Sequence, residues 1–267
     1  MNKKRILFLM FAAAMLFTAC SKDDDNTTTN ADMQTFTVSG VEFTMVKVEP
    51  GTFMMGAIEG DVEVTNNEKP VHQVTLTKPF YMAQTEVTQA LWQAVMDTNP
   101  SYFNEGGNLP VEQVSYNDAI EFCSRLSELT GHTFTLPTEA QWEYAARGGQ
   151  NAPATPTVYA GGSEIGTVAW YTDNCDGTTH AVGSKAPNEI GLYDMSGSVR
   201  EWCLDWYGNS YSANAQTDPQ GPSTGTNRVT RGGGWASWAR ECRISARMDF
   251  YPGNKYGDTG FRLVMLP

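Results

Sequence analysis

The second half of the chain limits the fold most strongly, because it offers little regular secondary structure. After Gly149 the sequence is rich in Gly, Asn, Asp, Trp and Tyr, and it shows no amphipathic helical pattern. A segment of this kind is organised by long loops, and such loops need side-chain hydrogen bonds or bound ions to hold them. We therefore expect loops, rather than helices, to shape this half of the molecule.

The first half carries clear strand patterns. Alternating or short apolar runs predict strands over residues 41–48, 52–55 and 71–76. No linker rich in Pro, Gly and Ser and no fixed-period repeat interrupts residues 38–267. We therefore expect these residues to form one domain.

Three helices have explicit start signals in the same half. Thr88 precedes the first helix, and Ser115 and Thr138 begin capping-box patterns for the second and third. Gly131 ends the second helix, and a Gly-Gly pair stops the third. The two halves together predict a mixed α and β domain, with most of its helices and strands in the first half of the sequence.

Two glutamates in the third helix, Glu139 and Glu143, lie one turn apart and could mimic an acid/base pair. In a capped helix, however, acidic residues stabilise the first turn and pair with a basic residue four positions later. We therefore expect a structural role, with Arg147 as the partner at i,i+4.

The amino terminus predicts export and lipidation. A basic start is followed by twelve apolar residues and then by Thr18-Ala19-Cys20. This pattern is typical of a signal peptide, here residues 1–19, and its apolar run is too short to span a bilayer. Residues 16–20 resemble a bacterial lipobox, which would make Cys20 the acylated first residue of the mature protein. An ordinary secreted protein is the alternative.

Residues 20–37 predict an acidic, disordered tether, because they are polar and lack periodicity. The run Ser-Lys-Asp-Asp-Asp after Cys20 resembles the acidic tag that sends lipoproteins of some Gram-negative bacteria to the outer face of the outer membrane. We therefore expect a surface-exposed outer-membrane lipoprotein of a Gram-negative bacterium, held at the membrane by its lipid and not embedded in it.

The charge of the chain excludes two classes of partner. The full sequence has a formal net charge of −12, and removing the three positive charges of the leader brings it to −15. So acidic a surface repels phosphate backbones, which argues against nucleic acid, and it does not favour anionic lipid head groups.

Several motifs follow one another in the order of a known family. The longest, LPTEAQWEYAARGG, is nearly a family signature. The whole series lies at residues 70–74, 80–81, 86–89, 109–115, 136–149, 188–197, 201–202, 205–206, 228–235 and 260–262. Over residues 38–267 the chain resembles the formylglycine-generating enzyme (sulfatase-modifying factor) domain. The resemblance implies a compact α+β fold that is low in regular structure and distantly like C-type lectin domains.

The same resemblance locates a degenerate catalytic site. The oxidases of the family convert a substrate cysteine to formylglycine with copper and oxygen, and soft thiolate pairs select Cu(I). The two cysteine positions that follow the RGG motif fall here on Ser237 and Cys242. A lone thiolate beside a hydroxyl makes a poor Cu(I) site, so we do not expect copper or a competent oxidase.

The remaining cysteines and the tryptophans have structural interpretations. We expect Cys123 to pack as a small hydrophobe on the second helix. Cys203 and Cys242 could pair, since an exported domain can keep disulfides. Most tryptophans fill the core in this family. Trp235 and Trp238 are the exceptions, and we predict that they contact a ligand together with Arg240, within residues 231–259.

Calcium is the metal that the resemblance implies, with a structural role. Hard cations take carboxylate, amide and carbonyl oxygens. At one family site, the positions matching Asp194 and Glu201 give side chains and those matching Gly197 and Val199 give carbonyls. A second site would use the position matching Asn174. The alternative is that these residues only cap turns.

We therefore expect a cell-envelope lipoprotein that binds a protein, peptide or glycan, or that serves in an envelope complex of the gliding or secretion type. The first alternative is a protein-modifying oxidase that acts on cysteine in sulfatases. A different oxidation, as in the iron-dependent sulfoxide synthases of this fold, is a third, and those enzymes need a histidine-rich helical partner domain.

Overall fold

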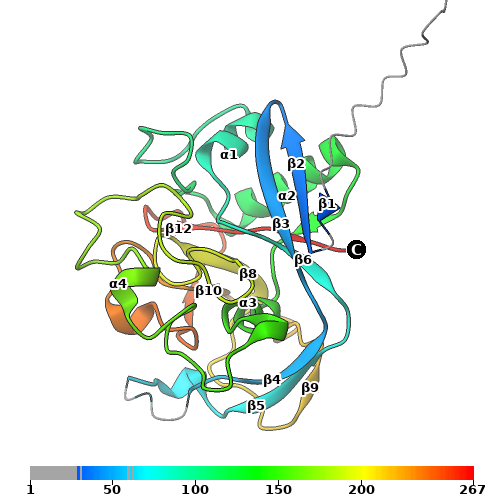
Figure 1. Ribbon diagram of the computed structural model, residues 1–267, viewed down its shortest axis with the longest axis vertical. Helices are drawn as coiled ribbons and strands as arrows, with labels where there is room; N and C mark the ends of the chain where they lie inside the picture. The colour runs from blue at the N-terminus through cyan, green and yellow to red at the C-terminus, as the bar shows by residue number, and fades with distance from the viewer. Residues whose placement is uncertain (1–28, 31, 59–60, 62) are drawn as a thin grey trace, which may run out of the picture.

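The computed structural model describes residues 29–30, 32–58, 61 and 63–267, and three sheets organise them (Figure 1). The largest has the order β1-β2-β3-β6-β13-β7, the second β11-β10-β8-β12 and the third β4-β5-β9. The strands are β1 Thr29–Asn30, β2 Met33–Val38, β3 Val41–Val48, β4 Gly51–Met55, β5 His72–Leu76, β6 Phe80–Ala83, β7 Phe134–Thr135, β8 Arg200–Trp206, β9 Gln216–Thr217, β10 Arg228–Arg231, β11 Met248–Phe250, β12 Thr259–Gly260 and β13 Val264–Met265.

The helices lie mainly in the first half, as the sequence predicts. α1 and α2 lie beside β2 and β3, and α3 lies near β8 and β10 (Figure 1). Within the described part of the chain, none of the helices is long and apolar enough to cross a membrane. The helices are α1 Gln89–Met96, α2 Tyr116–Thr130, α3 Glu139–Ala146 and α4 Ile165–Val168, with 3₁₀ turns η1 Asn66–Glu68, η2 Gly149–Asn151 and η3 Ala239–Glu241.

The predicted helix starts are confirmed. Thr88 Oγ1 accepts a hydrogen bond from the backbone N–H of Leu91 at 3.2 Å. Ser115 begins a reciprocal capping box in α2, and Thr138 begins another in α3. Gly131 ends α2 in the left-handed conformation, with φ = 74°. The strands predicted over residues 41–48, 52–55 and 71–76 correspond to β3, β4 and β5.

The tether predicted over residues 20–37 is wrong at its carboxyl-terminal end. Residues 33–38 form β2, which pairs in register with β3 and buries Phe36 and Val38. Ser39 and Gly40 join the strands and both have positive φ, as the two-residue turn of a tight hairpin requires. The folded domain therefore includes β2. The leader, residues 1–19, and the lipidation site Cys20 lie outside the described residues.

Side-chain hydrogen bonds hold the loops of the second half. The Asn188 side chain accepts hydrogen bonds from the backbone N–H groups of Ile190 and Leu192 and donates to the Ala145 carbonyl at 2.7 Å. One amide thereby fixes a loop and ties it to the last turn of α3. This half has α4, of four residues, as its longest helix within the described chain.

Two large apolar clusters fill the interior. One lies between α1, α2 and the large sheet, and it includes Trp92, Trp202 and Cys123. The other surrounds α3 and includes Trp142 and Cys203. The expectation that tryptophans and Cys123 pack in the core is confirmed for these residues.

The proposed disulfide between Cys203 and Cys242 is wrong. Cys203 belongs to the cluster around α3, whereas Cys242 packs with Val168 in a third, smaller cluster. The four cysteines of the described chain are all buried free thiols: Cys123, Cys175, Cys203 and Cys242.

Candidate functional site

The loop after β10 carries the two positions that match the oxidase cysteines. Ser237 is fully buried, and its Oγ accepts a hydrogen bond from the Gly234 N–H at 2.9 Å. The Ser237 N–H in turn donates to the Gly234 carbonyl at 2.8 Å. The Ser237 hydroxyl therefore closes a tight turn and is not presented to a substrate.

Cys242 lies at the end of the same loop and is also fully buried. Burial raises the pKa of its thiol to about 12, so the thiolate that binds a metal or attacks a substrate is scarce at neutral pH. A Cβ on Gly233 would lie 2.7 Å from the Cys242 sulfur, so the loop packs directly on this thiol. The geometry makes Cys242 a packing residue.

A third cysteine, which the sequence did not single out, borders this loop. Cys175 is buried, and its Sγ donates to the Trp235 carbonyl at 3.1 Å. Nearby, the Thr172 N–H donates to the Ser237 carbonyl at 3.0 Å. Residues 172–175 therefore support the loop from beneath, a role that only the three-dimensional structure reveals.

Two aromatic side chains of this loop, and two from the segment between α1 and α2, reach the surface of the protein. Trp238 is 58% exposed, whereas Trp235 is half-buried, with its Nε1 donating to the Gly257 carbonyl at 2.8 Å. The Trp235 ring meets Phe103 edge-on at 5.3 Å, and Phe103 meets Tyr102 at 4.9 Å. We call Tyr102, Phe103, Trp235 and Trp238 the aromatic surface. The predicted ligand residue Arg240 is exposed in the same loop.

Glu112 fixes the position of Phe103 within this surface. Its Oε1 accepts a hydrogen bond from the Phe103 N–H at 2.8 Å, while its Oε2 is buried and has no hydrogen-bond partner among the described residues. Burial raises the pKa of Glu112 to about 7. The carboxyl group is therefore largely protonated in mildly acidic solution.

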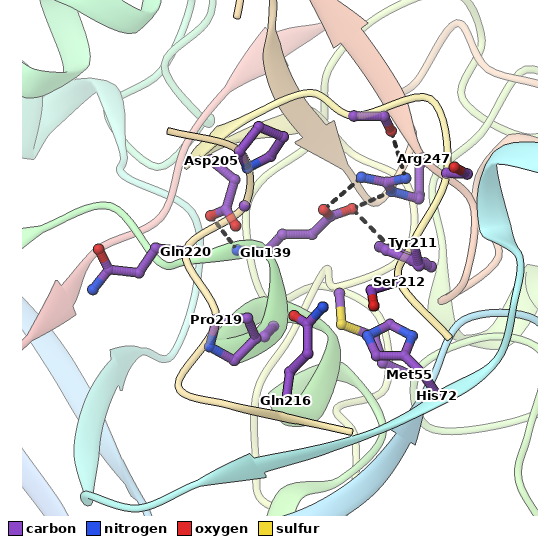
Figure 2. A pocket seen from close by; sticks show the side chains of 15 residues that line it. Met55, His72, Glu139, Asp205, Tyr211, Ser212, Gln216, Pro219, Gln220 and Arg247 are labelled. Atoms are coloured by element: carbon purple, nitrogen blue, oxygen red, sulfur yellow. Dashed lines mark hydrogen bonds and ion pairs between the residues drawn. The ribbon is translucent and has the colours of Figure 1, made fainter. Parts of the chain in front are cut away.

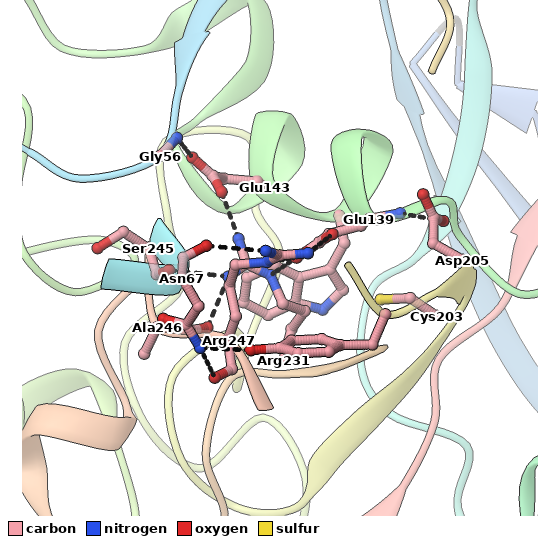
Figure 3. A network of polar contacts seen from close by, with 12 residues as sticks. Gly56, Asn67, Glu139, Glu143, Cys203, Asp205, Arg231, Ser245, Ala246 and Arg247 are labelled. Atoms are coloured by element: carbon pink, nitrogen blue, oxygen red, sulfur yellow. Dashed lines mark hydrogen bonds and ion pairs between the residues drawn. The ribbon is translucent and has the colours of Figure 1, made fainter. Parts of the chain in front are cut away.

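Buried arginine–glutamate pairs hold the base of the loop (Figure 3). Arg231, the last residue of β10, pairs with Glu143 of α3 and donates to the carbonyls of Ser245 and Ala246. Arg247 binds both carboxylate oxygens of Glu139, at 2.5 and 2.7 Å. These pairs clamp both ends of the loop to α3.

The expected partners of the α3 glutamates are therefore confirmed only in part. Arg147 does pair with Glu143, at 2.6 Å. Glu139 and Glu143 are buried, however, and their other partners, Arg231 and Arg247, come from the far end of the chain. Burial opposes ionisation of Glu139, but the charges of Arg247 and Arg231 outweigh it and hold its pKa below the usual value.

The first predicted calcium site contains a guanidinium group. Arg262 donates to both Glu201 oxygens at 2.6 Å, and Trp142 Nε1 donates to Glu201 Oε2 at 2.6 Å. Asp194 Oδ2 accepts from the Gly183 N–H at 2.6 Å. Glu201 is therefore already neutralised, and these residues suit an arginine better than a calcium ion.

The residues of the other predicted calcium ligands are held by local hydrogen bonds, which in Gly197 and Val199 involve the N–H groups and not the carbonyls predicted as ligands. The Gly197 N–H donates to the Gly232 carbonyl at 2.8 Å, and the Val199 N–H donates to Glu86 Oε1 at 2.9 Å. Asn174 closes its own turn, accepting from the Tyr171 N–H and donating to the Ala169 carbonyl. The described residues contain no cluster of three or more acidic, histidine or cysteine side chains arranged to hold a metal. Calcium binding stays a prediction.

Comparison with known proteins agrees with this fold. Residues 29–266 match the model of the sulfatase-modifying factor enzyme 1-like domain. The chain belongs to this family. It is 31% identical to the chaperone protein LppX of Paenibacillus barcinonensis, over 98% of this chain and 99% of that protein. It is 30% identical to the formylglycine-generating enzyme of Streptomyces coelicolor, over 81% and 87%.

Similarity to a solved structure confirms the expected fold. Treponema denticola variable protein 1 superimposes with a TM-score of 0.80 at 33% identity, covering 88% of this chain and 99% of that one. The predicted α+β fold of the formylglycine-generating enzyme, low in helix and strand, is therefore correct. Within this fold, the loop after β10 offers a buried hydroxyl, Ser237, and a buried thiol, Cys242.

Proposed function

We propose that this protein is a non-catalytic binding domain that takes protein or peptide segments on its aromatic surface. The observation that carries the proposal is the state of the loop after β10, where Ser237 and Cys242 are buried while Trp238 of the same loop is 58% exposed. The positions that would carry oxidation chemistry serve as packing, and the loop displays a large aromatic side chain instead.

The composition of the surface supports this choice of ligand. Tryptophan, tyrosine and arginine dominate the energetics of protein interfaces, because they bury much area and keep a polar end. Trp238 and Arg240 are exposed on the loop that is clamped to α3, and Tyr102 is exposed on the segment between α1 and α2, where it contacts Phe103 beside Trp235. A full-length relative is named a chaperone, which is consistent with a protein ligand.

The binding test uses a pair of variants with matched exposure. Trp238→Ala removes an aromatic side chain that is 58% exposed, and Leu129→Ala removes an apolar side chain that is 60% exposed on α2. On a peptide array, Trp238→Ala should weaken binding by about tenfold or more, as at an interface hot spot, and Leu129→Ala should leave it unchanged. Equal binding by both variants would contradict the proposal, and retention on a glycan array alone would identify a sugar ligand.

We propose further that the domain is a surface-exposed lipoprotein of the outer membrane, anchored through Cys20. The signal-peptide pattern and the acidic run after Cys20 support this location. Metabolic labelling with a fatty acid should mark the wild-type protein and not the Cys20→Ser variant. Protease treatment of intact cells should then degrade the wild-type domain; a protected domain would place it on the inner side.

A further inference from the structure

A cavity lies on another part of the molecule, away from the loop after β10. It has a volume of about 320 Å³ and opens between β5, the start of α3 and the loop that follows β8 (Figure 2). In Figure 1, β5 and β9 lie at the lower edge, whereas α4, whose Val168 packs with Cys242, lies at the left. This pocket, which has both polar and apolar walls, is thus separate from the aromatic surface, and its size suits a small ligand or one side chain.

The one arginine that lines the pocket is fully engaged by the protein. Arg247 binds both oxygens of Glu139 and also donates to the carbonyls of Asn67 and Gly208, at 2.8 and 3.0 Å. Tyr211 completes the set, since its hydroxyl donates to Glu139 Oε1 at 3.1 Å. Arg247 is therefore hydrogen-bonded throughout by the protein, and Glu139 is also 3.5 Å from Arg231, so neither side chain is free to bind a charged ligand directly.

Asp205 takes no part in these ion pairs. It is 3% exposed at the end of β8 and lines the pocket (Figure 2). Its Oδ2 accepts a hydrogen bond from the Glu139 N–H at 2.8 Å, but it makes no salt bridge within the described residues. A buried carboxylate without a direct ion pair is costly even with the charge of Arg247 nearby, and a cation from outside would relieve that cost.

The rest of the lining fits an alkyl chain that ends in such a cation. Met55, Pro219 and Pro222 provide apolar walls, and Gln216 extends from β9 with its amide towards the cavity (Figure 2). We propose that the pocket binds a primary alkylammonium group, such as the side chain of a lysine, with Asp205 as its counter-ion. The methylenes would pack on the walls and Gln216 would accept a further hydrogen bond.

The titration of Asp205 predicts how the affinity for an ammonium group changes with pH. Burial, and then the charge of Glu139, raise the pKa of Asp205 to about 7. The other titratable groups around the pocket are His72 on β5, Tyr211, and Arg247. Only ionised Asp205 attracts an ammonium ion. Between pH 6 and pH 8 the ionised fraction rises about tenfold, so apparent affinity should rise by about the same factor.

The experiment titrates purified protein by calorimetry with n-butylammonium and, separately, with the peptide acetyl-Gly-Lys-Gly-amide. Both should bind about tenfold more tightly at pH 8 than at pH 6. Binding of the amine alone would identify a free-amine site. 1-Butanol, the neutral analogue, should not bind. The variant His72→Gln should keep the pH dependence, which separates Asp205 from histidine.

Variants of the pocket decide the result. Asp205→Asn preserves the acceptor for the Glu139 N–H and should abolish both the affinity and its pH dependence. Gln220 is exposed at the rim, so Gln220→Lys should fold and place its own ammonium group in the pocket, whereas Gln220→Met adds no charge. Gln220→Lys should block binding and Gln220→Met should not. Equal binding by the two, unchanged binding in Asp205→Asn, or binding of 1-butanol would overturn the proposal.

Discussion

Arg262 holds the Glu201 carboxylate in a two-point contact, with Nε on Oε2 and Nη2 on Oε1, both at 2.6 Å. Both side chains are completely buried. Two more carboxyl groups, Glu86 and Asp194, lie close enough that their charges also raise the pKa of Arg262. One guanidinium group therefore neutralises Glu201 and partly offsets the cost of burying two further carboxyl groups, and the centre of the fold depends on it.

Arg262→Met tests that dependence. Removing one partner of a buried ion pair leaves an uncompensated charge, so the free energy of unfolding should fall by about 3–5 kcal/mol in urea denaturation. The pair Arg125–Glu121 has the same N–O distance of 2.6 Å but is about half exposed, so Arg125→Met should cost no more than about 0.5 kcal/mol. Similar losses in the two variants would show that burial is not what makes Arg262 important.

Removal of calcium should have little effect at the same place. Because Arg262 already occupies both oxygens of Glu201, chelation by EGTA should leave the melting temperature of the purified protein unchanged, as measured by calorimetry. A melting temperature that rises with added calcium, and that no longer rises in Asp194→Asn, would restore the calcium site predicted from the sequence.

Glu112→Gln should change the pH dependence of stability. The pKa of Glu112 is raised from 4.5 to about 7 on folding, so its contribution is fully present below pH 4.5 and is lost as pH rises to about 7. The variant cannot ionise at this position. Its free energy of unfolding, measured by urea denaturation, should therefore rise relative to that of the wild type as the pH increases from 4.5 to about 7. Glu121→Gln, at an exposed position, should keep the wild-type profile. A constant difference between Glu112→Gln and wild type from pH 4.5 to 8 would contradict the account.

The start of the domain can be tested with two neighbouring residues. Phe36 is 6% exposed and packs on Phe43 and Phe134, whereas Thr37 is exposed. Phe36→Ala should lower the free energy of unfolding by about 3–5 kcal/mol, and Thr37→Ala should cost about 0.5 kcal/mol or less. Denaturation midpoints that match wild type in both variants would mean that residues up to 37 form a tether after all.

Short sequence patterns predicted several helices and strands, because caps and alternating apolar residues act over a few neighbouring positions. The capping boxes at Ser115 and Thr138 start their helices because they satisfy backbone groups within the same turn, and the alternating apolar residues of 41–48 give β3 its buried face. The hairpin before β3 was missed although its signal is present. Ser39-Gly40 lies between the alternating apolar residues of β2 and β3, and the polar composition of the preceding segment masked it.

The sequence predicted where the loop after β10 lies in the chain, but not which residues attach it to α3. Motif order drew attention to Ser237, Trp238 and Cys242, which the structure shows on one loop; their part in function stays a prediction. The arginines that clamp it could not be identified, because an arginine in a sequence indicates a surface residue until its buried partner is known. Arg231 and Arg247 find theirs about 90 to 110 positions away, at Glu143 and Glu139.

The most direct test of the central claim is an assay for the oxidation itself. Purified protein is incubated with Cu(I), oxygen and a Cys-x-Pro-x-Arg peptide, and the peptide is read by mass spectrometry, with the Streptomyces coelicolor formylglycine-generating enzyme as positive control. Because Ser237 and Cys242 are buried packing residues, we predict no conversion of the peptide cysteine to an aldehyde. Conversion by the wild type that is lost in Cys242→Ala would contradict the account and make this protein an oxidase with one thiol.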